Sequence, residues 1–276
     1  MSFETIQFER RDGVAVLTLN RPERVNAMDR AMLSEINLAM DDVETDAGIK
    51  ALVVRGAGKN FSSGFNLKEQ IEKPFSGVKE WKRILDQDYE AVMRFWFCTK
   101  PTIAAIQGYC LAGAFELAMA CDLAIAEEDA LFGEPELKFG AGIVVMLLPW
   151  MVGPKIAKEI ILRGLDHITS EEAARLGLVN RVVPSGTAFE KAFAWARDIA
   201  VVDPMLMQET KRAINRTYEI MGLVQALESA LEIDLRIEGE GSSDKIQFLN
   251  IARQKGLRAA LAWRDARFTS GESGRG

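Results

Sequence analysis

A single carboxylate stands in an apolar stretch near the middle of the chain. Glu116 is the only charged residue between Gly108 and Cys121. A carboxylate among groups that cannot solvate it is costly unless a partner or a reaction makes use of it. Further along, Glu134 and Glu136 stand between other apolar runs. Two carboxylates in one apolar pocket can divide acid and base work between them, so this pattern predicts carboxylate acid–base chemistry.

Glycines near these carboxylates suit a second part of such a site. Gly113 precedes Glu116 by three residues, which is about one helical turn. The first N–H groups of a helix lack internal partners and carry positive potential, and an N–H from the Gly64–Phe65 turn could join them. Two such donors suit a carbonyl oxygen that becomes anionic in a transition state. Tight helix packing at Gly113 and a dipole partner or buried ion pair at Glu116 are the alternatives, and these residues alone do not separate Glu134 from Glu136.

Other motifs that could carry chemistry are incomplete. Gly58-Lys59 has the look of a phosphate-loop end, but Val53 stands where the first glycine is required and Asn60 replaces Ser or Thr. The segment 140–142 (Gly-Ala-Gly) has no third glycine in register for a dinucleotide fingerprint. The only histidine, His167, cannot make a His-rich metal site, so we expect no metal and favour a carboxylate over His167 as the acid or base.

Composition excludes several classes of partner. The chain has 276 residues, of which 48% are hydrophobic and 27% charged, as in an ordinary globular protein. Its net charge of -6 gives no electrostatic case for nucleic acid or an anionic membrane as a partner. The apolar run 139–154 is shorter than the ~20 residues that span a bilayer. The three cysteines form no CxxC pair and the start shows no signal-peptide pattern, so we expect a cytoplasmic protein.

Strand and helix patterns alternate through the first two-thirds of the chain, which favours an α/β core. Later patterns are helical, which places a soft boundary near residue 200, with a core at 1–200 and a helical region at 201–276. Residues after about Phe268 are rich in Gly and Ser, and we expect disorder there. Expected strands are 6–10, 14–19, 51–55, 102–106, 122–126 and 178–183. Expected helices are 29–46, 78–97, 113–120, 156–163, 170–176, 188–200, 204–221 and 223–237, with two more after Gly241.

Several segments in this order closely resemble the crotonase superfamily, the enoyl-CoA hydratase/isomerase group. The resemblance covers most of the first 200 residues, and it implies an α/β fold built as a spiral of β-β-α units with a C-terminal α-helical trimerisation region. It also implies a homotrimer or homohexamer and a place in fatty acid metabolism. The matching segments are 19–27, 60–67, 100–122, 132–142 and 173–179, with 256–264 similar to the last helix of some members.

The resemblance also implies an activity and a set of site residues. The activity is enoyl-CoA hydration, with an acyl-CoA substrate and no separate cofactor, since coenzyme A is part of the substrate. By position in the motifs, the backbone N–H donors fall on Phe65 and Gly113, and the catalytic pair falls on Glu116 and Glu136 rather than Glu134. Other implied positions are Arg24, Asn66, Leu67 and Lys68 for CoA, and Phe115, Ile143 and Val144 for the acyl pocket.

Departures from the family pattern leave the acyl group open. The motif at 111–115 is poorer in glycine than is usual, Phe65-Asn66 replaces a commoner small residue and Asp, and 143–145 is more apolar than expected. Isomerisation, thioester hydrolysis and hydration followed by carbon–carbon cleavage are the rival chemistries of the family. A non-catalytic CoA-binding protein is a rival of another class, and loss of a glutamate would be its mark. Which glutamate is acid and which is base is not decided by the sequence, because a coupled pair titrates as a unit.

Overall fold

The computed structural model describes residues 3–72 and 77–268, and its central element is a six-stranded sheet. The strand order is β1-β2-β3-β4-β6-β9, in which β1 runs antiparallel to β2 and the other neighbours are parallel. The strands expected at 6–10 and 14–19 are confirmed, and β1 and β2 form a hairpin whose turn is Asp12-Gly13. The strands are β1 (Ile6–Arg11), β2 (Val14–Leu19), β3 (Ala51–Gly56), β4 (Thr102–Ile106), β6 (Leu123–Glu127) and β9 (Arg181–Val183).

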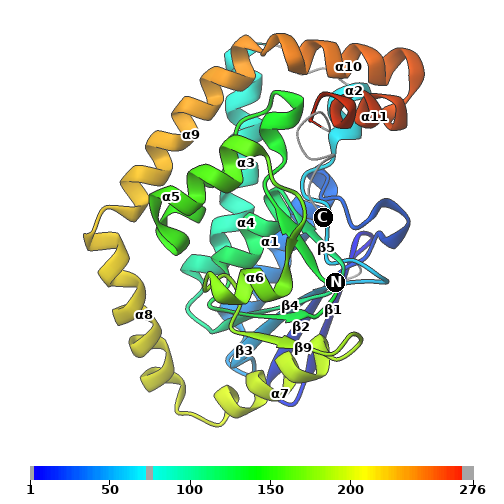
Figure 1. Ribbon diagram of the computed structural model, residues 1–276. Coiled ribbons are helices and arrows are strands. Elements are labelled where there is room, and N and C mark those ends of the chain that lie inside the picture. The colour runs from blue at the N-terminus through cyan, green and yellow to red at the C-terminus, as the bar shows by residue number, and fades with distance from the viewer. Residues whose placement is uncertain (1–2, 73–76, 269–276) are drawn as a thin grey trace.

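Helices cover both faces of this sheet, as parallel strands require. On one face, Val16, Val53 and Ile103 pack against α7 (Ala188–Ala200). On the other face lie α1, α3 and α4, whose apolar side chains form the main core (Figure 1). The helix expected at 29–46 is confirmed as α1, which Asp29 caps by accepting a hydrogen bond from Met32 N at 3.0 Å. The bounds of these three helices are α1 (Arg30–Thr45), α3 (Gly77–Phe97) and α4 (Gly113–Ala120).

A second, small sheet carries the candidate carboxylates. It consists of β5 (Tyr109–Leu111), β7 (Leu131–Gly133) and β8 (Ile168–Thr169), none of which the sequence led us to expect. β5 leads directly into α4, which carries Glu116, and β7 leads into the short 3-10 helix η2 (Glu136–Phe139). Because β5 and β7 are parallel neighbours, both segments start from the same edge of this sheet.

The remaining elements of the core are short or kinked. α5 (Leu148–Arg163) begins before the expected start at 156, because it continues across a kink at Gly153 and Pro154. The other elements are η1 (Pro22–Arg24), α2 (Leu67–Glu72) and α6 (Ser170–Arg175).

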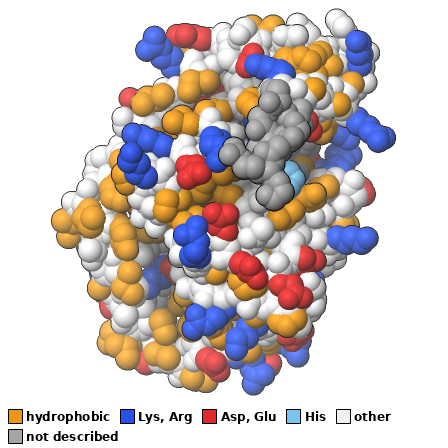
Figure 2. Space-filling model, in the orientation of Figure 1, with side chains coloured by type: hydrophobic (Ala, Val, Ile, Leu, Met, Phe, Trp, Pro, Cys, Tyr) orange, Lys and Arg blue, Asp and Glu red, His pale blue; other side chains and the backbone are white. Residues whose placement is uncertain are grey.

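Four helices follow the core. α9 packs along α3, and α10 packs against both α11 and α2 (Figure 1). Hydrophobic side chains gather along the left edge of the molecule, over α8 (Figure 2). The expectation for residues after Phe268 falls outside the described residues, and within the described ranges no helix combines the length and apolarity that crossing a membrane requires. The helices are α8 (Pro204–Ile220), α9 (Leu223–Glu240), α10 (Ser243–Lys255) and α11 (Leu257–Phe268).

Candidate active site

The Gly64–Phe65 turn lies against the start of α4. A Cβ built on Gly64 would lie 2.7 Å from Ala112 Cβ and 3.0 Å from Gly113 N, so no larger residue fits there. The turn is fixed by Met28, whose N–H donates to Gly64 O at 2.9 Å and whose O accepts from Asn66 N at 2.9 Å. Successive backbone groups of an extended segment point to opposite sides, so the Phe65 N–H faces away from Met28.

The start of α4 supplies the second N–H. Gly113 is the first residue of α4, where backbone donors have no partner within the helix. The Phe65 ring lies over this residue so closely that a Cβ on Gly113 would overlap it. Ala112 holds a backbone conformation (φ 56, ψ -137) that favours glycine, and its N–H donates to Gly133 O at 2.8 Å. The structure therefore brings the backbone of Phe65 and Gly113 to one junction.

Three carboxyl groups meet beside this junction. Glu116, one turn into α4, is buried, and its Oε1 accepts a hydrogen bond from Val145 N at 3.1 Å. Glu136 at the start of η2 and Glu134 just before it are also buried. Carboxylate oxygens of the three lie within 4.8 Å of one another. Within the described ranges, one oxygen of each carboxylate, the Oε2, is buried without a hydrogen-bond partner.

Burial and mutual repulsion favour the protonated forms of these groups. Loss of solvation, and then the charge of Glu136, raise the pKa of Glu116 well above its ordinary value. Burial likewise raises the pKa of Glu136 to about 7. The pKa of Glu134 is raised well above normal by burial and then by its two neighbours. The cluster therefore retains protons near neutral pH, as acid–base catalysis by carboxyl groups requires.

The same cluster meets the geometric requirement for a metal site, because each carboxylate of Glu116, Glu134 and Glu136 offers one oxygen within 4.8 Å of the others. A cation would have to displace the protons that burial favours, since metal ligands must be deprotonated. Mg²⁺ and Ca²⁺ also need six or more oxygen ligands, which three carboxylates supply only with added water. That the site needs no metal stays a prediction.

A cavity of about 620 Å³ reaches this cluster at Glu136, and Phe65 also lines it. Among the described residues, Glu116, Glu134 and Gly113 lie behind this lining rather than in it. All four residues implied for CoA also line it. Of the three residues implied for the acyl pocket, only Val144 does so. Phe115 instead packs against Phe132, with ring centroids 5.4 Å apart, and Ile143 is buried beside the cavity rather than in its lining. The CoA residues in the lining are Arg24, Asn66, Leu67 and Lys68.

The helical tail contributes residues that the sequence did not reveal. Asp234 and Glu238 of α9, together with Asp88 of α3, line the same cavity. No local pattern marks these positions, because each lies on an amphipathic helix with several other acidic residues. His167 also borders the cavity, but its ring is largely exposed and pairs with Asp166 at 2.6 Å.

The tail also fixes the loop that holds Glu116. Ser242 Oγ donates to Gly140 O at 2.8 Å, and Glu238 Oε1 accepts from Gly142 N at 3.2 Å. Further along this loop, the Val145 N–H makes its hydrogen bond to Glu116. Helices α9 and α10 therefore determine the position of a loop that orients a candidate catalytic carboxylate.

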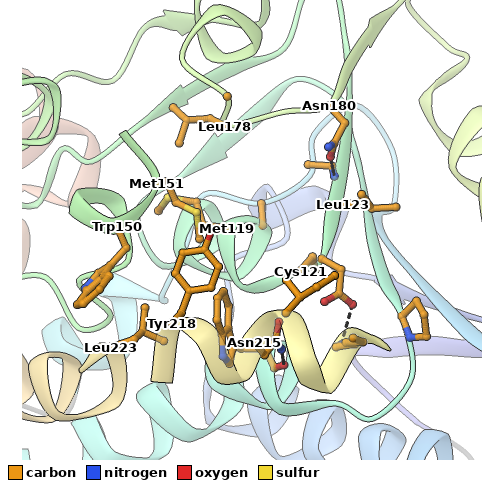
Figure 3. A pocket seen from close by; sticks show the side chains of 18 of the residues that line it. Met119, Cys121, Leu123, Trp150, Met151, Leu178, Asn180, Asn215, Tyr218 and Leu223 are labelled. Carbon is orange, nitrogen blue, oxygen red and sulfur yellow. Dashed lines mark hydrogen bonds and ion pairs between the residues drawn. The ribbon is translucent and has the colours of Figure 1, made fainter. Parts of the chain in front are cut away.

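A second cavity of about 390 Å³ lies at the other end of α4, beneath α8 (Figure 3). Met119, Trp150 and Tyr218 line it with apolar surface (Figure 3). Lys211 and Asp122 also belong to the lining and form an ion pair at 2.7 Å. Among the described residues that line this second cavity, Asp122 is the one carboxylate. The carboxylate acid–base chemistry is therefore assigned to the cavity of about 620 Å³.

Comparison with known proteins decides the family. The family model described as enoyl-CoA hydratase/isomerase matches residues 9–269. The chain belongs to this family. A solved enoyl-CoA hydratase/isomerase from Xanthobacter autotrophicus Py2 is 62% identical and superposes with a TM-score of 0.96, covering 97% of this chain and 99% of that one. A solved family member from Mycobacterium thermoresistibile is 34% identical with a TM-score of 0.80, covering 85% and 95% of the two chains. The expected crotonase-like α/β fold is thus confirmed.

Curated members of the enoyl-CoA hydratase/isomerase family are similar over most of their length. The short-chain-enoyl-CoA hydratase of Clostridium acetobutylicum is 32% identical over 253 residues, which is 90% of this chain and 93% of that protein. The 2,3-dehydroadipyl-CoA hydratase of Escherichia coli is 34% identical over 215 residues, which is 76% of this chain and 82% of that protein.

Proposed function

We propose that this protein is an enoyl-CoA hydratase, which adds water across the C2=C3 bond of a 2-enoyl-CoA thioester. The observation that carries the proposal is the meeting of two buried glutamates, Glu116 and Glu136, beside the backbone of Phe65 and Gly113. Relatives named as enoyl-CoA hydratases at 32–38% identity support the same activity. A non-catalytic CoA-binding protein has no need for both glutamates, and both are present.

The chemistry follows from these groups. The two N–H donors bind the thioester oxygen and stabilise the negative charge that forms on it, by about 3 kcal/mol per donor. As the oxygen of water bonds to C3, one glutamate accepts the proton that this water loses. A protonated glutamate gives its proton to C2, so the pair ends with as many protons as it began with. No separate cofactor takes part in the proposed reaction, because CoA arrives as part of the substrate.

The CoA moiety is proposed to lie against Arg24 and Lys68, with Asn66 and Leu67 beside them. The four residues line the same cavity as Glu136, and Arg24 and Lys68 bring the positive charge that phosphate groups need. Arg24→Ala and Lys68→Ala should therefore raise KM for crotonyl-CoA more than they lower kcat, as steady-state kinetics would measure.

The activity is tested by loss of the conjugated-thioester absorbance of crotonyl-CoA, with product identification. Glu116→Gln and Glu136→Gln keep the size of each side chain but remove its acid–base function, so each should lower kcat by at least about 100-fold. Glu190→Gln, an exposed position on α7, is the matched control and should keep full activity.

Three outcomes would contradict parts of this proposal. Undiminished turnover in both glutamine variants would remove Glu116 and Glu136 from the chemistry. A protein that shifts the double bond of a 3-enoyl-CoA but hydrates no 2-enoyl-CoA would be an isomerase. Release of free CoA thiol would instead identify a hydrolase, and release of a shorter acyl-CoA a hydratase-lyase.

The assembly is proposed to be a homotrimer or homohexamer. Apolar side chains on α8 are exposed and lie beside the second cavity, which is the surface expected of an unpartnered interface (Figures 2 and 3). The exposed side chains on α8 include Met205, Leu206, Ile214, Tyr218 and Ile220. Light scattering would give the mass of the assembly.

A cytoplasmic location is also proposed, on the support of three buried free cysteines, and cell fractionation would test it.

A further inference from the structure

One buried carboxylate of the cavity has no hydrogen-bond partner among the described residues and no role in the reaction described above. Asp234 of α9 is only 2% exposed, and within the described ranges neither of its side-chain oxygens has a hydrogen-bond partner. An ionised carboxylate accepts hydrogen bonds and donates none. Leaving such a group buried and unpaired is costly, so a polar partner is missing from its surroundings.

The one cation whose charge acts on Asp234 is already used elsewhere. Lys245 lowers the pKa of Asp234 by its charge, but its ion pair is with Glu238, and Arg30 is ion-paired with Asp88. Two carboxylates therefore share Lys245, and within the described ranges Asp234 makes no ion pair of its own. The surroundings of Asp234 therefore attract a hydrogen-bond donor and repel an anion.

Backbone geometry holds the Asp234 carboxylate against the cavity wall. A Cβ on Gly142 would overlap Asp234 Oδ1, so the carboxylate packs directly on the backbone of the loop that includes Val144. Asp234, Val144 and Glu136 line one continuous cavity. The charge of Asp234 raises the pKa of both Glu116 and Glu136, so it lies within electrostatic reach of the two candidate catalytic carboxyl groups.

One cavity holds all the groups that a bound thioester would meet. Arg24 and Lys68 border it where CoA is proposed to bind, Glu136 borders it near the N–H donors, and Val144 and Asp234 line it as well. With CoA and the thioester carbonyl assigned to the first two places, the inference assigns the acyl chain to the lining that includes Val144 and Asp234.

We propose that Asp234 binds a hydrogen-bond donor on the distal part of the acyl group, a hydroxyl or an ammonium. The preferred substrate is then a 2-enoyl-CoA with a polar tail rather than a simple alkyl one. This inference rests on the proposed hydratase function for its substrate class, but its binding prediction does not require turnover.

The test compares tails of matched length. The substrates are hex-2-enoyl-CoA, 6-hydroxyhex-2-enoyl-CoA, 6-aminohex-2-enoyl-CoA and 2,3-dehydroadipyl-CoA, with 8-hydroxyoct-2-enoyl-CoA and oct-2-enoyl-CoA to allow a longer reach. At least one hydroxyl or amino substrate should exceed its alkyl counterpart by about 10- to 100-fold in kcat/KM, as expected for a hydrogen bond to a charged group. The carboxylate tail of 2,3-dehydroadipyl-CoA should be the poorest. Whether hydroxyl or amine is preferred identifies the donor.

The variant Asp234→Asn tests whether Asp234 causes the preference for a donor tail. The variant should reduce the preference for the donor tail over the alkyl tail by about 10-fold or more, because a neutral amide binds a donor less strongly than a carboxylate does. Glu232→Gln, an exposed acidic position on the same helix, should keep the preference. Thermal unfolding of each variant shows whether it is folded.

Binding separates this inference from the proposed function. Calorimetry with the saturated pair hexanoyl-CoA and 6-hydroxyhexanoyl-CoA, and with the eight-carbon pair, measures the preference without any reaction. Preferential binding without hydration would overturn the hydratase proposal and leave the inference standing. Hydration with equal use of all tails, or a preference unchanged by Asp234→Asn, would overturn the inference.

Discussion

At the scale of single residues, the site depends on carboxyl groups that burial prevents from ionising at their usual pH. Glu116, Glu134 and Glu136 share one apolar region and repel one another when charged. The productive state of the pair needs one carboxyl protonated and one ionised. Ordinary solvent-exposed glutamates would both be ionised at neutral pH.

The pH dependence of the reaction follows from the most acidic member of this cluster. Because the pKa of Glu136 is raised to about 7, the free enzyme becomes productive as pH rises through that value. We expect kcat/KM for crotonyl-CoA to fall below about pH 7 and to level off above it. Infrared difference spectra should show a carboxyl band that titrates in this range and is absent from Glu136→Gln. A flat rate profile across about pH 5 to 9 would contradict it.

Asp234 should make the folded protein less stable as pH rises. Burial raises its pKa from 3.8 to about 6, so well below pH 3.8 it is protonated in folded and unfolded states alike and carries no penalty. Above about pH 6 the folded state bears the full penalty, about 3 kcal/mol at about 1.4 kcal/mol per pKa unit. Asp234→Asn should thus be more stable than the unmodified protein at pH 8, by about 2–3 kcal/mol, with the gap closing toward pH 4.

Urea unfolding of both proteins at one concentration and several pH values measures this gap. An equal difference in the free energy of unfolding at every pH would show that the charge on Asp234 does not cause it. A variant less stable than the unmodified protein at pH 8 would contradict the predicted sign of the effect.

The sequence identified the residues whose chemical type is unusual for their neighbours. Glu116 was found because it is the only charge in an apolar run, and Gly113 because of its spacing from Glu116. Asp234 could not be found in this way. It is one of five acidic residues on α9, and only the packing of α9 against α3 and the loop at Gly142 buries it. Burial of this kind depends on contacts distant in sequence.

At the scale of elements, short strands and loops position the site while long helices hold them. β5 and β7 each have three residues, yet they aim α4 and η2 at one point. Long amphipathic helices such as α3 were predicted nearly to the residue, because their periodicity is local. The three strands of the small sheet were missed, because pairing between distant segments creates them.

Ser242 links the helical tail to the site at this scale. Its side chain accepts a hydrogen bond from Lys245 N at 3.1 Å and caps α10, while it donates to Gly140 O. Ser242→Ala should cost about 1 kcal/mol of stability through the lost cap. It should also lower kcat several-fold, because the loop from Gly140 to Val145 that holds Glu116 loses an anchor.

Thermal unfolding and steady-state kinetics measure the two effects of Ser242→Ala. Ser229→Ala, an exposed serine on α9, is the matched control and should change neither. A kcat equal to that of the control would show that the loop is held without this contact.

At the scale of the whole molecule, much of the apolar surface of α8 is exposed in the part of the chain that the structure describes. Leu206 and Ile214 are 58% and 59% exposed, and an exposed cluster of such residues marks an interface more often than free surface. Leu206→Glu combined with Ile214→Glu should convert the proposed trimer or hexamer into smaller species, because burying two charges in an apolar interface is costly.

Light scattering after size-exclusion chromatography measures this change in mass, with Glu209→Gln on the same helix as the control. A monomeric unmodified protein would remove the proposed assembly. An assembly that survives both substitutions would place its interface elsewhere.

The hydrogen bonds that join Glu238 and Ser242 to the Gly140–Val145 loop have a consequence for synthesis of the protein on the ribosome. The ribosome makes the chain from its N-terminus, so the sheet, Glu116 and Glu136 all emerge before α9 and α10 exist. A chain interrupted ahead of Glu238 would contain both glutamates, but its Gly140–Val145 loop would lack the hydrogen bonds to Glu238 and Ser242. We therefore expect full turnover to begin only with finished chains, so that activity itself reports completed translation.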